Sequence, residues 1–396
     1  MSTKCLLVIV ASLTLGFASD AYASKAVHAS CGQTITADTT LESDLTKCSG
    51  PGIRIGADDI TLDLNGHSIT GKGKDVGVDN TAGYDGVTIE DGSIRNFMES
   101  VAIVGASDNH LRGLSLSDNR HVGFYVQNSS AIQIEQNSVV DIRFAGIFLW
   151  RSHDIRVERN SSSGNGAGVV ADASDHLAIE GNVAEGNDGG GIELHESSES
   201  HVAGNTVSDN GGAGIFLDAA DTNQVSSNIA SRNVDGIGVI GNANTITDNQ
   251  VADTSGCKKG CGYGISLEAG AGNLIAHNDV RRTLRDGIRI DAFFPELPTF
   301  DNVVRDNVVS DATVDGLSIG TEGPGTVSGT LIERNVATDS GDDGFDIRRS
   351  AATLTANTAN DNFDLGIEAV PGVVDGGGNR ASRNGNPLQC TNVFCR

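Results

Sequence analysis

The chain has 396 residues, of which 51 are Gly and 31 are Asn, with only 6 Pro and 4% aromatic residues. This composition excludes collagen, and it argues against a helical bundle because Gly and Asn are poor helix formers. The net charge of −25 makes nucleic acid and anionic lipid unfavourable partners. Length alone predicts two or more domains, unless the chain is a repeat.

The N-terminus has the pattern of an export signal. Lys4 precedes an apolar run too short to span a bilayer, and Ala21-Tyr22-Ala23 offers a cleavage site. We therefore predict a signal peptide over residues 1–23 and a secreted or periplasmic protein that begins near Ser24. No later apolar stretch is long enough for a transmembrane segment.

Six cysteines remain after this signal, and an even number in an exported protein predicts three disulfides. Several pairings are open, and we favour the local one: Cys31–Cys48, Cys257–Cys261 and Cys390–Cys395. The spacings do not suit a zinc site. The first disulfide would close an N-terminal cap over residues 24–50 with a short helix at Leu41–Leu45, and the last a C-terminal cap over residues 389–396.

A Gly-apolar-x-apolar unit recurs from Gly123 to Gly366, at steps of 22–23 or 28–29 residues. Asn residues keep the same rhythm, from Asn137 to Asn357 and from Asn165 to Asn233. Each repeat holds about three short strands, which cannot bury an apolar face unless successive coils stack. The sequence therefore predicts an all-β fold: a single-stranded parallel β-helix of about 13 coils over residues 51–388, with apolar and Asn ladders along its length.

The strings before the repeats are Cys31-Gly-Gln-Thr-Ile35, Gly56-Ala-Asp58 and Ile60-Thr-Leu-Asp-Leu-Asn-Gly-His67. They resemble the opening of secreted bacterial right-handed parallel β-helix proteins, and the repeats resemble the pectate-lyase-like superfamily. The resemblance implies a right-handed helix. It implies no single activity, because the superfamily includes polysaccharide lyases, hydrolases, epimerases and non-enzymatic members.

A first group of outward positions lies in the middle of the chain. Four aromatic residues there are candidate platforms for sugar rings: Tyr125, Phe148, Trp150 and Phe216. Asp172, His195 and Asp218 take equivalent places in consecutive coils, so the carboxyls should lie about 9.6 Å apart, near the upper end for an inverting glycosidase. His195 would be a base or proton shuttle.

This middle group indicates a hydrolase or epimerase as one alternative. The Gly-His-Gly and Arg-Ile-Lys strings of β-helical polygalacturonases are absent, and so is the Asp-Pro-His-Asp string of alginate epimerases. The same residues also fit a stacking column with incidental charges. Copper handling, known in relatives, has only 9 scattered His and 2 Met in its support.

A second group surrounds Gly344, where carboxylates converge from two coils: Asp315, Asp342, Asp343 and Asp346. Four such groups repel one another unless a cation lies between them, which predicts a Ca²⁺ site. The string is similar to the calcium site of one family of β-helical pectate lyases, which implies β-elimination of a uronate polymer with Lys as base. No Lys follows the motif here, so an arginine would have to serve or the activity is absent, although arginine is normally protonated. The candidates after the motif are Arg348, Arg349, Arg380 and Arg383, and Arg289 is a further candidate among the outward positions. A solvated acidic face or turn-capping Asp residues are the alternative.

The long steps insert three loops, at 254–263, 293–300 and 321–329. Long loops on a regular scaffold often carry function, so we predict that they wall a cleft in which Lys258 and Lys259 meet an anionic polymer. We expect a monomer that binds an acidic polysaccharide and cleaves it by calcium-assisted β-elimination. The alternatives are a non-catalytic carbohydrate-binding or cell-envelope solenoid, and the hydrolase or epimerase.

Overall fold

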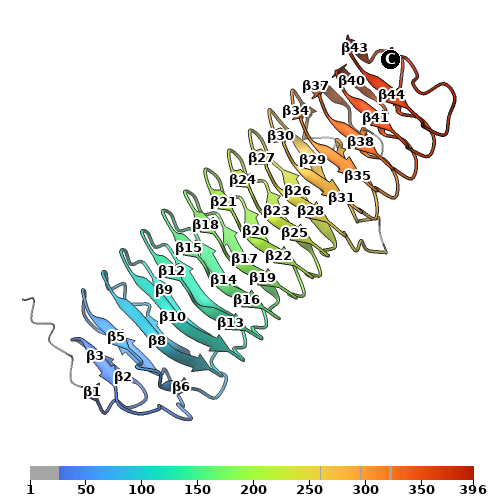
Figure 1. Cartoon of the computed structure of the whole chain (residues 1–396). Coiled ribbons are helices and arrows are strands. Elements are labelled where there is room, and N and C mark those ends of the chain that lie inside the picture. The colour runs from blue at the N-terminus through green and yellow to red at the C-terminus, as the bar shows by residue number, and fades with distance from the viewer. Residues whose placement is uncertain (1–25, 259, 295–296, 321–322) are drawn as a thin grey trace, which may run out of the picture.

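The computed structural model describes residues 26–258, 260–294, 297–320 and 323–396, with side chains from His28 onward. They form one elongated parallel β-helix that runs from the N-terminal to the C-terminal end (Figure 1). The fold prediction is confirmed. The predicted count of about 13 coils is too low, because the described first sheet contains 15 strands. Four of these strands lie before Val122, where the repeat was not recognised although Gly52-Ile53-Arg54-Ile55 has its Gly-apolar-x-apolar pattern.

Three sheets run along the molecule, and each receives one strand from almost every coil. The first sheet contains β2 (Gln33–Ile35), β4 (Ile53–Ile55), β7 (Val76–Asn80), β9 (Glu99–Val104), β11 (Val122–Gln127), β14 (Ala145–Trp150), β17 (Ala167–Asp172), β20 (Ile192–His195), β23 (Ala213–Asp218), β26 (Asp235–Ile240), β29 (Ile265–Ala271), β32 (Ile288–Ile290), β36 (Leu317–Ile319), β39 (Phe345–Ile347) and β42 (Ile367–Ala369).

The second sheet contains β1 (Ala26–Val27), β3 (Thr39–Leu41), β5 (Thr61–Asp63), β8 (Thr88–Arg95), β10 (His110–Ser117), β12 (Gln133–Glu135), β15 (Arg156–Glu158), β18 (Ala178–Glu180), β21 (His201–Ala203), β24 (Gln224–Ser226), β27 (Thr245–Thr247), β30 (Leu274–Ala276), β33 (Thr299–Phe300), β34 (Val303–Arg305), β37 (Val327–Glu333), β40 (Ser350–Thr355) and β43 (Val374–Gly377).

Strands β8 and β10 continue into the third sheet. Its remaining strands are β6 (Ser68–Thr70), β13 (Ser138–Val140), β16 (Ser161–Ser163), β19 (Val183–Glu185), β22 (Thr206–Ser208), β25 (Ile229–Ser231), β28 (Gln250–Ala252), β31 (Asp279–Arg281), β35 (Val308–Ser310), β38 (Val336–Thr338), β41 (Thr358–Asn360) and β44 (Arg380–Ser382).

The core follows from the period of two within each strand. In β14, Ile147 and Leu149 are fully buried, whereas Phe148 and Trp150 alternate with them and point outward. Stacked inward residues form one continuous apolar core along the described chain. The outward residues of the first sheet are therefore held at fixed, repeated positions on one face.

The recurring Gly of each repeat has a steric cause. A Cβ at Gly191 would lie 2.6 Å from the carbonyl oxygen of Gly214 in the next coil, and one at Gly344 would lie 2.6 Å from that of Gly366. No side chain fits in this space, so only Gly permits the close approach of successive coils at the start of the first-sheet strands.

The predicted Asn ladders are confirmed. The backbone N–H of Asn182 donates to Oδ1 of Asn205 at 2.8 Å, and its Nδ2 donates to the Val157 carbonyl at 2.8 Å. The residue before the ladder often has a left-handed backbone, as at Arg159 with φ 53°. Each corner thus turns sharply while a buried amide satisfies the backbone groups that the turn leaves unpaired.

The local disulfide pairing is confirmed at Cys31–Cys48, Cys257–Cys261 and Cys390–Cys395. The predicted short helix at Leu41–Leu45 is wrong. Leu41 ends strand β3, and Leu45 forms a parallel bridge with Ile69, because both side chains fill the core of the first coil. No described helix is long and apolar enough to cross a membrane. Residues 1–23, the predicted signal peptide, lie outside the described residues.

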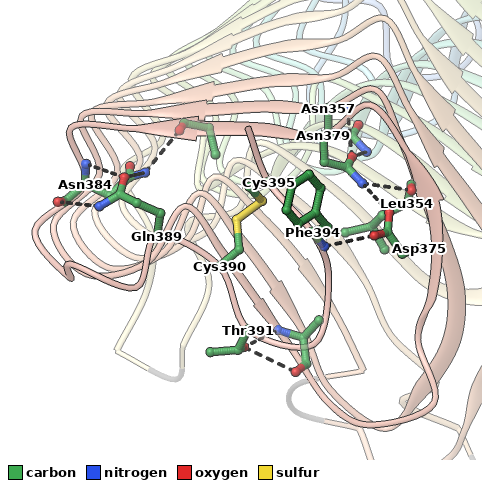
Figure 2. Close-up of a disulfide and its surroundings, with 12 residues drawn as sticks. Leu354, Asn357, Asp375, Asn379, Asn384, Gln389, Cys390, Thr391, Phe394 and Cys395 are labelled. Atoms are coloured by element: carbon green, nitrogen blue, oxygen red, sulfur yellow. Dashed lines mark hydrogen bonds between the residues drawn. A yellow bond between two sulfur atoms is a disulfide. The ribbon is translucent and has the colours of Figure 1, made fainter.

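The C-terminal residues lie across the last coil (Figure 2). Gln389 extends the Asn ladder, because its Oε1 accepts from Nδ2 of Asn384 at 2.9 Å, while its carbonyl accepts from the Gly366 N–H at 2.8 Å. The Phe394 N–H donates to the Asp375 carboxylate at 2.9 Å. The end of the chain therefore occupies backbone groups at the edge of the first sheet.

Candidate functional site

The outward positions of the first sheet change character along the molecule. Tyr125, Phe148 and Phe216 are half-buried, whereas Arg289 and Asp346 are almost completely buried. The third inserted loop lies against this second part, because the Gly323 N–H donates to Oδ1 of Asp291 at 2.8 Å. The side chains there point away from the core, as predicted, yet they are shielded from solvent.

We call the region of the first sheet around Phe148 the open part and the region around Asp346 the covered part. A groove lies where the two parts meet. One hollow of about 410 Å³ is lined by Glu193, His195, Phe216, Asp235, Ser266 and Glu268, with several glycines. A smaller hollow of about 160 Å³ is lined by Asp235, Tyr263, Glu268, Arg289 and Phe293. Because Asp235 and Glu268 border both, the two hollows adjoin. We call them together the first-sheet groove.

His195 lies between two carboxylates at one end of this groove. Its Nε2 is 3.2 Å from Glu193 and its Nδ1 is 3.3 Å from Asp218. The hydrogen bond to Glu193, with a further contribution from Asp218, raises the pKa of His195. No hydrogen bond or ion pair joins Asp172 to His195 among the described residues. Asp172, His195 and Asp218 do take equivalent places in consecutive strands, as predicted, but the carboxylates that contact His195 are those of Glu193 and Asp218.

Glu268 reaches the groove through an irregularity in the sheet. Leu267 pairs with Val239, but Ala269 pairs with Ile240, so Glu268 is an extra residue in β29. Such bulges redirect side chains and are frequent beside active sites. Burial raises the pKa of Glu268, and the nearby Arg289 lowers it only in part.

Asp235 joins the groove to the first inserted loop. Its Oδ1 accepts the N–H groups of Gly262 at 2.6 Å and Tyr263 at 2.9 Å. Asp235 and Glu268 were not among the residues predicted to be functional. The available signal was the step of 28 residues between Gly236 and Gly264, which marks an insertion at this coil.

Arg289, one of the predicted bases, is a fixed cation. Its Nη2 lies 3.2 Å from Oδ2 of Asp291, and its guanidinium lies 4.5 Å from the ring centre of Tyr263. A guanidinium held by a carboxylate and an aromatic ring keeps its proton. The position is suited to holding a ligand or a neighbouring anion in place.

The predicted acidic cluster divides into two groups. Asp315, Asp343 and Asp346 each bring one carboxylate oxygen within 4.8 Å of the others, whereas Asp342 groups with Asp343 and Asp364. The first three are buried, and Asp342 is exposed. Oδ1 of Asp315 also accepts the Asp343 N–H at 3.0 Å, so this carboxylate caps the backbone of the next coil as well.

Burial controls the protonation of these three groups. It raises the pKa of Asp315 to about 8, with a further contribution from Asp286. It raises the pKa of Asp343 to about 7 and that of Asp346 to about 6. Arg348 donates from Nε to Asp346 at 2.9 Å and lies 3.3 Å from Glu368. This arginine is thus held as a cation between two carboxylates.

Three predicted aromatic residues lie together, and the fourth lies apart. The rings of Tyr125 and Phe148 are 6.0 Å apart, and Trp150 follows Phe148 in β14. Phe216 instead stands in the groove, with its ring centre 6.3 Å from that of His195. Lys258 is exposed and is not among the lining residues, while Lys259 lies outside the described residues.

The family model described as "Periplasmic copper-binding protein (NosD)" matches residues 31–255, which is more than half of the chain. The chain belongs to the NosD family. A second model, described as "Right handed beta helix region", matches residues 235–330. The two models together cover most of this NosD-family solenoid, and the right-handed sense implied by the sequence resemblance is confirmed. No curated protein matches the chain significantly.

Solved structures share the fold of this NosD-family chain at low sequence identity. A double mutant of the periplasmic alginate epimerase AlgG gives a TM-score of 0.55 at 14% identity, covering 77% of this chain and 75% of that one. A single mutant of AlgG gives 0.53 at 13% identity, with 82% and 77% covered. The A-module of the Azotobacter vinelandii mannuronan C-5 epimerase AlgE4 gives 0.46 at 16% identity, with 92% and 91% covered, a score too low to carry an argument. These likenesses show the fold alone.

Proposed function

We propose that this protein is exported and acts on a polysaccharide that lies in the first-sheet groove. The observation that carries the proposal is the groove itself, in which His195, Asp235 and Glu268 line one hollow with the ring of Phe216. Long clefts with a few polar groups among apolar ones are typical ligand sites. The fold shared with alginate epimerases is compatible with this role but does not establish it.

We propose hydrolysis as the reaction of this groove. Glu268, whose pKa is raised by burial, would donate a proton to the glycosidic oxygen as that bond breaks. A second group, Asp235 or the His195 pair, would take a proton from water while the water oxygen bonds to the anomeric carbon. The same acid and base could serve an epimerase, which would remove and return a proton at one sugar carbon.

The test is release of reducing ends from a panel of neutral, acidic and amino polysaccharides by the purified mature chain. We expect activity on one class and its loss in Glu268→Gln, which keeps the shape of the side chain but not its acidity. The matched control is Glu185→Gln, at an exposed position of the third sheet. Binding without any product would indicate the non-catalytic carbohydrate-binding solenoid. Neither binding nor product on the whole panel would overturn the proposal.

A second candidate function is calcium-assisted β-elimination of a uronate polymer. It is favoured by the three buried carboxylates that meet at Asp315, Asp343 and Asp346, because Ca²⁺ takes such oxygen ligands. The pairing of Arg348 with Asp346 and Glu368 does not suit the predicted base. Unsaturated products that absorb in the ultraviolet, formed with Ca²⁺ and lost with chelator or in Asp343→Ala/Asp346→Ala, would support this reaction.

Copper, the metal in the description of the family, is not matched by the described side chains. The six described cysteines all form disulfides, and no group of three potential ligands in this part of the chain includes a histidine. Copper sites in proteins use mainly sulfur and imidazole ligands, whereas the groups found here are carboxylates alone. We therefore assign no step to copper.

A further inference from the structure

We infer that the first-sheet groove selects a polysaccharide that carries free, protonated amino groups over one that carries uronate carboxylates. The inference rests on the proposed function and names the substrate class of the same site. It differs from the acidic polymer expected from the sequence, because the structure shows which charges line the groove and which lie outside it.

The cations of the groove are already paired with carboxylates. Arg289 lies against Asp291, which is completely buried, and His195 lies against Asp218. His195 is shared by Glu193 and Asp218, so one positive charge faces two carboxylates, and no ion pair is found for Asp235 among the described residues, even when Glu268 carries the proton of a general acid. The groove is therefore anionic in a chain whose formal net charge is −25.

A uronate in this groove would place another carboxylate among these groups. Like charges at short range raise the free energy of the complex, and the effect grows as the bound sugar excludes water. Lys258, which was expected to meet an anionic polymer, is exposed and lies outside the lining. The described cations of the lining already pair with carboxylates, so none remains to form an ion pair with the uronate.

An ammonium group meets the opposite conditions. It offers three N–H donors and no acceptor, and the lining carboxylates are acceptors. Oδ1 of Asp235 is used by two backbone N–H groups, and no hydrogen bond is found for its Oδ2 among the described residues. Phe216 and Phe293 add aromatic faces, which attract cations and pack against sugar rings.

The experiment is calorimetric titration of the full mature chain with three oligosaccharides of equal length. They are a glucosamine oligomer with protonated amines, its N-acetylated counterpart and an oligogalacturonate. We expect the glucosamine oligomer to bind at least about tenfold more tightly than the other two, with an affinity that falls as salt is added.

Variants assign the selectivity to the groove. Asp235→Asn keeps the acceptor for the two loop N–H groups, and with Glu193→Gln it should abolish most of the preference for the amine. Glu185→Gln with Asp248→Asn removes the same charge from exposed positions elsewhere and should leave the preference unchanged. Should the paired groove variant misfold, Asp218→Asn alone should still weaken the preference, because it removes one charge next to His195.

The outcomes separate the inference from the proposed function. Equal or tighter binding of the N-acetylated oligomer or the uronate overturns the inference. If that binding is also weakened by Phe216→Ala, the groove still binds polysaccharide and the proposed function survives. Failure of all three oligomers to bind overturns both.

Discussion

The middle and the C-terminal parts of the first sheet occupy the same positions of the β-helix, yet their outer surfaces differ. Around Phe148, outward side chains are half-buried and aromatic, whereas around Asp346 they are charged and almost inaccessible. The coils themselves hardly differ, since the same Gly and Asn ladders run through both. The second part also carries the inserted loops, of which the third is anchored on Asp291.

The comparison separates scaffold from chemistry. A uniform solenoid fixes where side chains point, whereas their exposure to water differs from one part of the sheet to the other. Burial is the first cause of the raised pKa of Glu268, Asp315 and Asp343. The groove lies at the boundary, where open aromatic surface and buried acids meet.

The largest expected effect is the loss of activity in Glu268→Gln. Removing a general acid should lower kcat by roughly 100- to 10,000-fold, whereas Phe148→Ala in the open part should change it little. Steady-state kinetics on the substrate found in the panel measures this contrast. Similar losses in both variants would contradict the division into an active groove and a passive aromatic surface.

Replacing one Asn of the ladder should destabilise the β-helix equally in the middle and C-terminal parts. Asn205→Ala removes a buried amide that accepts the Asn182 N–H and donates to the Ile179 carbonyl, and Asn307→Ala removes its equivalent in the C-terminal part. Each should lower the free energy of unfolding by about 2–4 kcal/mol, because buried partners lose their hydrogen bonds. Denaturant unfolding is the measurement, with the exposed Ser138→Ala as control. A much smaller loss at one site would show that the ladder is not uniform.

The dependence of folding stability on pH should arise from the buried carboxyl groups of the covered part. The pKa of Asp315 rises from 3.8 to about 8 on folding, so the folded chain holds a proton that the unfolded chain releases. Stability from this group is thus greatest at low pH and falls as pH rises from about 4 to 8, by about 1.4 kcal/mol per unit at most. Asp315→Asn should raise the Tm near pH 8 and flatten the fall.

Thermal unfolding across this pH range tests that expectation. Asn keeps an oxygen that accepts the Asp343 N–H, so the backbone cap is retained. Added Ca²⁺ should stabilise the wild type near pH 8 and leave Asp343→Ala/Asp346→Ala unchanged, if the second candidate function is correct. If the Tm of Asp315→Asn depends on pH in the same way as that of the wild type, the Asp315 carboxyl ionises with little loss of folding free energy.

The smallest expected effect is the change in oligosaccharide affinity caused by a substitution in the open part. Trp150→Ala removes a half-buried ring that already carries Arg151 at 4.9 Å. If the open aromatic residues extend the groove, affinity for long oligosaccharides should fall about fivefold, corresponding to about 1 kcal/mol, and affinity for short ones should not change. Equal weakening for short and long ligands would place Trp150 in the groove's own binding site.

The sequence was sufficient for the scaffold because its causes are local and repeated. The Gly at each first-sheet strand, the Asn at each corner and the inward apolar pairs follow from sterics and hydrogen bonding within two coils. The coils before Val122 were undercounted because their Gly unit is complete only at Gly52-Ile53-Arg54-Ile55, and Ser100 replaces the Gly in the coil of β9. The helix predicted at Leu41–Leu45 failed because the spacing of those leucines also suits two short strands.

The candidate site was less predictable because its features arise between coils and loops. The columns placed His195 beside Asp218 correctly, but Glu268 enters the groove through a bulge that changes the register at Ile240. The outward Asp315 and Asp346 were recognised as a group, yet an outward position was expected to be exposed and both residues are buried. Neither fact is encoded in the spacing of the repeat.

The short C-terminal segment over the last coil sets where growth of the stack stops. Successive coils are separated by about 4.8 Å, the same spacing that joins chains in cross-β fibrils. Residues 386–396 use edge groups such as the Gly366 N–H and the Ile367 carbonyl that would otherwise accept another strand. A chain shortened before this segment should therefore expose these groups to pairing with another strand, so that one disulfide-closed loop guards the edge of the stack.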